Sequence, residues 1–259
     1  MPALLHRLPL ARSVLATAFA AAALAAAMPA GARAAHEMPH AAAPASMQPG
    51  PLADFAGVPV SQALREVANW AFFTRDNQGR AVVILDKHAA TVYAFSPQGK
   101  LFASAPALLG LTVGDDTLPG VGDKPLTEVR DEEKTTPAGR FVARPGWDDS
   151  GVDVVWIDYD AAVAMHRVID KVRAERRPER LASPLAQDRR ISFGCINLPI
   201  AFYEQVLSPT VRTLGAIVYV LPETRSPREV FGSWDVTDPA ARPAKFAAAP
   251  AAGGQHPAR

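Results

Sequence analysis

The stretch AVVILDKHAATVYAFSPQGKLFASAPALLGL, residues 81–111, indicates the fold class of this protein. Its apolar and β-branched runs are separated by the turn segments DKHAA and SPQGK, a pattern typical of consecutive antiparallel strands. It predicts a β-meander. Three later runs, DVVWIDYD, AVAMHRVI and GAIVYVLPE, have the same character and predict further strands. We therefore expect a mainly β fold with a few helices.

Helical patterns are confined to short segments on either side of these strands. Apolar residues from Val60 onward follow helical spacing, with Ser61 as a candidate cap, and DNQGR ends the segment. A second helix is predicted for IAFYEQVL, opened by Pro199. The long segment 114–146 is rich in Gly, Pro and acid and carries one expected strand, Arg140 to Ala143.

The N-terminus has the order of a secretory signal: basic residues, an uncharged stretch, then small residues ending at Ala34. The stretch is about 15 residues, where roughly 20 are needed to span a bilayer. We expect cleavage near Ala34 and a mature protein in the periplasm without a membrane span. The sequence predicts five segments: signal peptide 1–34, flexible lead-in 35–56, N-terminal helix 57–78, main domain 79–225 and disordered tail 226–259.

The charge balance and the cysteine count narrow the possible functions. The chain carries a formal net charge of +1, which gives no reason to expect nucleic acid as a partner. It contains one cysteine, Cys195, which excludes an internal disulfide. An unpaired cysteine in an exported protein raises the question of a reactive thiol or an intermolecular bond.

A cysteine nucleophile needs a base, because a thiol with a pKa near 8.5 is only slightly ionised at neutral pH. It also needs backbone N–H groups directed at the developing oxyanion. The segment Ser192 to Cys195 offers a turn for this purpose, since Gly194 allows a close backbone approach. His166, at the end of an apolar strand, is the candidate base. The other histidines lie in the signal, in the terminal segments or in the turn DKHAA: His6, His36, His40, His256 and His88.

A structural interpretation of the same residues stays open at this point. A free cysteine is often buried as a small apolar side chain. A histidine that follows an apolar run can equally be a hydrogen-bonded core residue. Composition and spacing favour neither interpretation.

Four elements in order resemble one known family. SFGCINLP, residues 192–199, resembles the signature of L,D-transpeptidase catalytic domains (the YkuD family), a Ser/Thr-His-Gly-Cys segment followed by an apolar residue and Asn or Arg. AVVILDKHAATVYAF is similar to that family's first hairpin, and TTPAGRF to its Thr-Pro-x-Gly-x-Phe segment. With His166 between them, these elements cover residues 79 to 223.

The resemblance implies an L,D-transpeptidase-like β-sandwich and an enzyme without metal or organic cofactor. In that family a cysteine attacks a peptide carbonyl of a peptidoglycan stem, forms a thioester and passes the acyl group to an amine of a neighbouring stem. It implies Cys195 as nucleophile, His166 as general base and the N–H groups of Gly194 and Cys195 as oxyanion donors. Ser192 would shape the turn, and Asn197 would anchor the loop or the substrate backbone, although both could serve the turn alone.

Three departures from the family pattern bear on the site. Phe193 replaces the usual histidine, and could form an apolar wall for the substrate or a core contact. Arg167 replaces the glycine that usually follows the catalytic histidine. The segment between His166 and Cys195 is long and basic. It is either a solvated surface or a lid in which Arg176, Arg177 or Arg180 binds a stem-peptide carboxylate.

Several functions remain compatible with the sequence. The leading prediction is a peptidoglycan L,D-transpeptidase that forms 3–3 crosslinks, or 1–3 crosslinks if the pocket selects the L-Ala–D-Glu bond. An L,D-carboxypeptidase or endopeptidase would use the same cysteine with water as the acceptor. A wall-binding module with a buried cysteine is the non-enzymatic alternative. The oligomeric state is not predicted.

Overall fold

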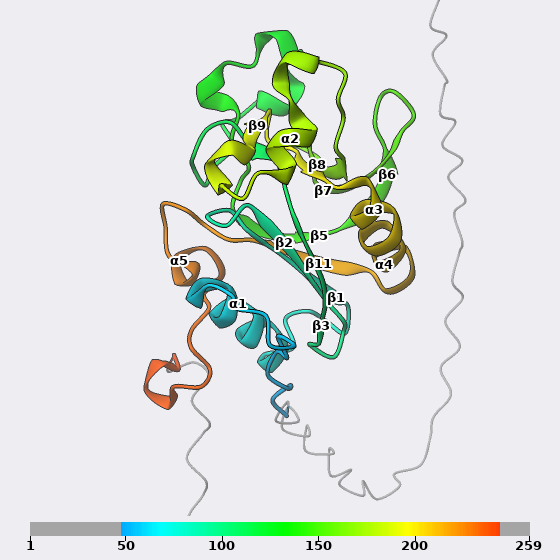
Figure 1. Cartoon of the computed structure of the whole chain (residues 1–259). Helices are drawn as coiled ribbons and strands as arrows, with labels where there is room; N and C mark the ends of the chain where they lie inside the picture. The colour runs from blue at the N-terminus through cyan, green and yellow to red at the C-terminus, as the bar shows by residue number, and fades with distance from the viewer. Residues whose placement is uncertain (1–47, 244–259) are drawn as a thin grey trace, which may run out of the picture. The chain divides into compact units, whose positions relative to one another are not determined.

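The computed structural model describes residues 48–243 (Figure 1). Eleven strands are assigned within this range: β1 (Ala81–Asp86), β2 (Thr91–Phe95), β3 (Leu101–Pro106), β4 (Leu109–Gly110), β5 (Gly139–Val142), β6 (Arg144–Trp147), β7 (Asp153–Asp158), β8 (Val163–Arg167), β9 (Arg190–Ser192), β10 (Ile196–Leu198) and β11 (Ala216–Val220). The α-helices are α1 (Gln62–Phe73), α2 (Arg177–Ala182), α3 (Ile200–Phe202), α4 (Ser208–Leu214) and α5 (Pro227–Phe231). Short helical turns include η4 (Arg173–Glu175), η5 (Ala186–Arg189) and the π-helical turn η6 (Tyr203–Leu207) between α3 and α4.

The strands form two main sheets and one small sheet. The larger has the order β3-β2-β1-β11-β5, the second has the order β10-β8-β7-β6, and β4 pairs with β9. Strands β1, β2 and β3 pair antiparallel in succession, so the predicted meander is confirmed. The prediction of a mainly β fold with a few helices is also confirmed.

Each face of the five-stranded sheet is covered by a different layer. Alternating residues of β1, such as Val83 and Leu85, join a core with β7, β8 and β10 of the second sheet. The intervening residues Val82 and Ile84 pack with α1 on the opposite face. In Figure 1, α1 lies along one side of this sheet, and β7 and β8 lie on the other. This is the packing of a sandwich, with a helical layer added outside it.

Helix α1 begins where the sequence predicted a cap. Ser61 Oγ accepts a hydrogen bond from the Leu64 N–H and donates one to Asp86 Oδ2 at 2.6 Å, which ties the helix start to the end of β1. The helix spans Gln62–Phe73 and is therefore shorter than the predicted range of 57–78. The segment after Phe73 forms turns instead.

The segments predicted to be flexible are ordered where the structure describes them. From 226 onward the chain forms α5, opened by a capping box at Ser226, and Trp234 is buried. Residues 48–56 belong to the predicted lead-in, yet Phe55 is buried against Phe95. Disorder is therefore the wrong prediction for 226–243, because aromatic side chains there join the core. The predicted signal peptide 1–34 lies outside the described residues.

A buried ion network fastens the long loop between β4 and β5 to the end of β11. Lys87, whose side chain is fully buried, donates to Asp115 Oδ1 at 3.0 Å and to the Thr136 carbonyl at 3.0 Å. Glu223 lies 3.5 Å from Lys87 Nζ and also pairs with Arg190. Burial alone would raise the pKa of Asp115. Hydrogen bonds from Thr224, the Glu223 N–H and Lys87 outweigh burial and hold this pKa well below its usual range.

Replacing Lys87 with methionine is expected to destabilise the fold by about 3–5 kcal/mol, because it removes the fully buried cation that Asp115 and Glu223 share. The measurement is the free energy of unfolding from urea denaturation. Lys100→Met, at an exposed position, is the matched control and should change this free energy by less than about 0.5 kcal/mol. Equal effects of the two substitutions would contradict the role given to the network.

Among residues 48–243, no helix has both the length and the apolar character needed to cross a bilayer.

Candidate active site

Cys195 and His166 are placed by two neighbouring parallel strands. Strand β8 carries His166, and Cys195 comes directly before β10. The strands pair with His166 opposite Asn197, so Cys195 lies next to the preceding part of β8. Ala164 and His166 are two residues apart on β8 and share one face of the strand. The parallel pairing therefore brings a thiol and an imidazole, 29 positions apart in sequence, to neighbouring strands of the second sheet.

The Cys195 thiol is half-buried and contacts the backbone of β8. Its Sγ accepts from the Ala164 N–H at 3.4 Å and lies 3.5 Å from the Ala162 carbonyl. Burial raises the pKa of this thiol, and the Ala164 N–H and the Arg177 charge only partly offset it. The thiol is therefore protonated at neutral pH, and a base is needed to make it nucleophilic.

His166 has a single defined tautomer. Its Nδ1 lies 2.7 Å from the Arg167 carbonyl oxygen, which can only accept, so Nδ1 carries the proton. The other ring nitrogen, Nε2, is left as the acceptor. Burial is the largest influence on the pKa of His166 and lowers it; the Arg167 carbonyl and Asp148 oppose this shift, and Arg177 adds to it. His166 is thus neutral at pH 7 and able to accept a proton.

Cys195 and His166 line one cavity of about 350 Å³. Within residues 48–243 no hydrogen bond joins their side chains directly. The walls are mainly apolar, with three charged residues, and comprise Asp148, Val152, Val154, Trp156, Ala164, Arg167, Val168, Ile169, Lys171 and Ile200 in addition to the pair. A largely apolar cavity that holds a thiol and a neutral imidazole is suited to attack on a carbonyl shielded from water.

The turn before Cys195 is closed by Ser192. Its Oγ accepts from the Gly194 N–H at 3.1 Å and donates to the Cys195 carbonyl at 2.6 Å. The Gly194 N–H was predicted as an oxyanion donor, but the turn already uses it. Sequence cannot reveal this, because the competing acceptor is a side chain two residues away whose rotamer decides the outcome.

Asn197 is fully buried, which favours the loop-anchoring alternative over contact with the substrate backbone. Its Nδ2 donates to the Cys195 carbonyl at 3.3 Å, and its Oδ1 accepts from Arg177 at 2.7 Å. Arg177 also pairs with Glu175 at 2.5 Å. Both side chains therefore anchor the loop, and Arg177 brings its charge close to the candidate pair.

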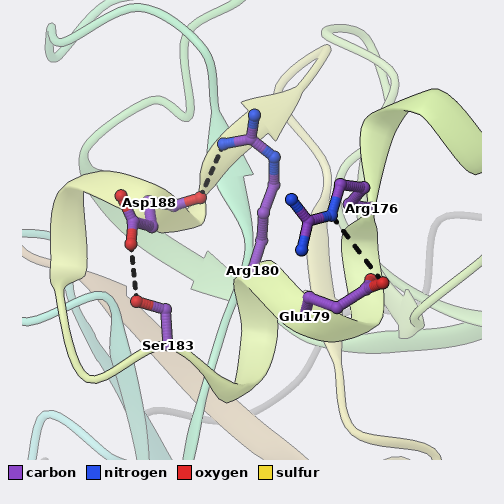
Figure 2. Close-up of a pocket in the computed structure, with 5 residues that line it drawn as sticks. All are labelled: Arg176, Glu179, Arg180, Ser183 and Asp188. Atoms are coloured by element: carbon purple, nitrogen blue, oxygen red, sulfur yellow. Dashed lines mark hydrogen bonds and ion pairs between the residues drawn. The ribbon is translucent and has the colours of Figure 1, made fainter.

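Arg180 lies in a different hollow, shown in Figure 2. Its guanidinium donates to the backbone carbonyls of Glu175 and Asp188 at 2.9 Å each, which ties α2 to η4 and η5. Arg176 pairs with Glu179 at the other side of this hollow. The structure thus does not bring Arg180 to Cys195, and hydrogen bonds of Arg180 hold the basic insert in a folded conformation.

Phe193 is half-buried and does not line the cavity of Cys195. Lys134 Nζ lies 4.4 Å from the centre of its ring. The predicted apolar wall is supplied instead by Val154, Trp156 and Ile200. These residues were missed because they come from β7 and α3, which only the tertiary fold places beside β8.

Two further residues of the site escaped the sequence analysis. Thr136 Oγ1 donates to the Gly194 carbonyl at 2.8 Å, although TTPAGRF had drawn attention to that segment. Arg167, noted only as a departure, supplies the carbonyl that orients His166. Its side chain pairs with Asp153 and Glu204 at 2.8 Å each.

Comparisons with known proteins give structural neighbours only. No family model and no curated protein matches the chain. Solved structures similar to it include an L,D-transpeptidase from Xylanimonas cellulosilytica (18% identity, TM-score 0.35, 54% of this chain and 60% of that chain). Others are the helical cell shape determining protein Pgp2 from Campylobacter jejuni (15%, 0.37, 57% and 49%) and the catalytic domain of an E. faecium L,D-transpeptidase (18%, 0.31, 55% and 95%).

The matches thus cover 60% or less of the first two of these neighbours. The neighbours named as L,D-transpeptidases are of the class that the sequence resembles.

The low pKa of His166 predicts how activity depends on pH. If His166 is the base for Cys195, it must be neutral, and activity should be lost as pH falls through the pKa of that residue. Because burial lowers this pKa below the ordinary value of about 6.5, kcat/KM should be nearly unchanged between pH 7 and pH 6.5 and decline only at lower pH. A profile of kcat/KM from pH 5 to 8 is the measurement. A decline centred above pH 7 would contradict the assignment.

Proposed function

We propose that this protein is a periplasmic peptidoglycan L,D-transpeptidase that works through a Cys195 thioester. The observation that carries the proposal is the placement of the Cys195 thiol and a neutral, oriented His166 on the wall of one cavity. The substrate class comes from the resemblance of SFGCINLP and the elements before it to the family signature.

The chemistry follows from the protonation states of the two side chains. His166 Nε2 accepts the thiol proton as Cys195 Sγ attacks the carbonyl of an L,D peptide bond in a stem peptide. A carbon–sulfur bond forms, and the carbonyl electrons move to oxygen. Collapse of this intermediate breaks the peptide bond, and the leaving amine takes the proton from His166. A thioester on Cys195 and a free D-amino acid remain.

The second half of the reaction releases the enzyme. An amine from a neighbouring stem attacks the thioester carbonyl and gives up a proton to His166, and the proton returns to the departing Cys195 sulfur. The product is a stem-to-stem amide crosslink. We propose the 3–3 type, with attack on the bond between diaminopimelate and D-alanine; a 1–3 crosslink would follow from attack on the L-Ala–D-Glu bond instead.

Hydrolysis is the second candidate, because the thiol is only half-buried and water could reach a thioester formed there. The enzyme would then be an L,D-carboxypeptidase or endopeptidase. A wall-binding module would need neither an accessible thiol nor an oriented imidazole.

Muropeptide analysis distinguishes these functions. The purified protein is incubated with sacculi and disaccharide-tetrapeptide, with Cys195→Ala as the matched control. We expect dimers that depend on Cys195, and their fragmentation assigns the linkage as 3–3 or 1–3. Shortened stems without dimers would indicate hydrolysis. Unchanged muropeptides together with retention on sacculi would indicate a binding module and overturn the proposal.

A further inference from the structure

The backbone amide of Cys195 is the oxyanion donor that the turn leaves available. The Gly194 N–H is taken by Ser192 Oγ at 3.1 Å. The Cys195 N–H has no hydrogen-bond partner within residues 48–243. Gly194 adopts φ = +134°, and a Cβ there would lie 2.9 Å from the Thr135 carbonyl oxygen, so only glycine fits the turn.

Thr136 holds the peptide unit to which this amide belongs. Its Oγ1 donates to the Gly194 carbonyl at 2.8 Å and accepts from the Gly110 N–H at 2.8 Å. The side chain is buried, with a residue exposure of 1%. Since the hydroxyl has one proton and is bonded on both sides, its orientation is fixed.

The buried ion network also holds the backbone of Thr136 in place. Its carbonyl accepts from Lys87 Nζ, which also bonds the Gly114 carbonyl and Asp115. The Thr136 hydroxyl therefore extends from a firmly held backbone toward the turn before Cys195.

The Gly194 carbonyl and the Cys195 N–H are two ends of one planar trans peptide unit, and they point in opposite directions. A hydrogen bond that holds the carbonyl toward Thr136 therefore directs the N–H away from Thr136. We propose that Thr136 is a positioning residue that aims the Cys195 N–H at the developing oxyanion. This inference deepens the proposed function: Thr136 touches no substrate and acts through the Gly194–Cys195 peptide.

Two thiol-modifying reagents, one that acylates and one that alkylates, distinguish this role from general support of the fold. p-Nitrophenyl acetate acylates a thiol through a tetrahedral oxyanion: the carbon–sulfur bond forms, p-nitrophenolate leaves and His166 takes the thiol proton. Iodoacetamide alkylates the same sulfur by displacing iodide, and no oxyanion forms. Since Cys195 is the only cysteine, the part of each rate that is lost in Cys195→Ala reports on this residue.

Thr136→Val removes the hydroxyl and keeps the side-chain shape, while Thr136→Ser keeps the hydroxyl. We expect Thr136→Val to lower the rate of acetylation by about 10- to 100-fold, because the Cys195 N–H is misdirected and not deleted. The alkylation rate should stay within about twofold, and Thr136→Ser should acetylate within about threefold of the wild-type protein. If Thr136→Val shows no cooperative thermal transition, Thr136→Ala is tested in its place by the same criteria. The smaller side chain of this variant leaves room for a bridging water.

Equal losses in both rates would assign Thr136 a purely structural role, and unchanged acetylation would remove any role in the oxyanion site; either result overturns the inference. A Thr136→Ser variant as impaired in acetylation as Thr136→Val would also contradict it. These reagents do not require a stem peptide. A failure of the proposed function, seen as absent dimers, is therefore distinguishable from a failure of this inference.

Discussion

Cys195→Ala is expected to abolish turnover of the stem peptide, with a loss of at least about 10⁴-fold in kcat, the scale found when an enzyme loses its nucleophile. Among residues 48–243, the polar contacts of Cys195 Sγ are two long ones, to the Ala164 N–H at 3.4 Å and the Ala162 carbonyl at 3.5 Å. Its removal should therefore leave the fold intact. The measurement is D-alanine release from disaccharide-tetrapeptide, with a thermal melt to establish that the variant is folded.

Cys195→Ser is a matched control for the size of the side chain. A serine hydroxyl is a far weaker nucleophile than a thiol, so this variant should be nearly as inactive. D-alanine release by a folded Cys195→Ala protein at more than a few per cent of the wild-type rate would show that the cysteine is not the nucleophile.

His166→Gln is expected to lower kcat by about 10²- to 10⁴-fold, the usual contribution of a general acid–base group. Glutamine approximates the size of the imidazole and can still donate a hydrogen bond to the Arg167 carbonyl, but it cannot accept a proton from the thiol. Because the pKa of Cys195 is raised by burial, the variant has little thiolate at neutral pH to compensate. KM should change by less than about threefold, since the proton transfer is made in the transition state.

His88→Gln is the matched control, because His88 is exposed in the turn between β1 and β2. It should retain wild-type kcat. A loss in His166→Gln of less than tenfold, or an equal loss in His88→Gln, would contradict the assignment of His166 as the base.

The strands could be predicted because their signals are local. The alternation of apolar and turn residues in 81–111 identified β1 to β3, and Ser61 identified the start of α1. Strand β6 was not predicted, because Arg144–Trp147 contains proline and glycine. It is an edge strand of its sheet, where the missing N–H of Pro145 is tolerated.

The tail was mispredicted because composition averages over a segment. The chain from 226 is rich in Ala, Pro and Gly, yet two aromatic residues within it make specific contacts. Phe231 packs against Tyr219 with ring centres 5.7 Å apart, and Trp234 lies 6.3 Å from Trp70. Single aromatic side chains of this kind bury apolar surface and stabilise the segment, and an average over its composition does not show this.

The candidate nucleophile and base could be identified from the sequence, but the residues that orient them could not. Cys195 was the single thiol, and His166 was the histidine that a strand could hold. The bonds that orient them involve Arg167, Thr136 and Ser192, and depend on backbone carbonyls and rotamers. These contacts form only when β8, β10 and the loop before β5 meet, so no local pattern encodes them.

The central claim is that Cys195 forms a thioester with a peptidoglycan stem. Its most direct test is intact-protein mass spectrometry after brief incubation with disaccharide-tetrapeptide and an acid quench, followed by peptide mapping. We predict a disaccharide-tripeptide adduct on Cys195 with release of one D-alanine, or the smaller disaccharide-alanyl adduct if the L-Ala–D-Glu bond is attacked. An unmodified Cys195 in a folded protein whose thiol iodoacetamide labels completely would contradict the claim.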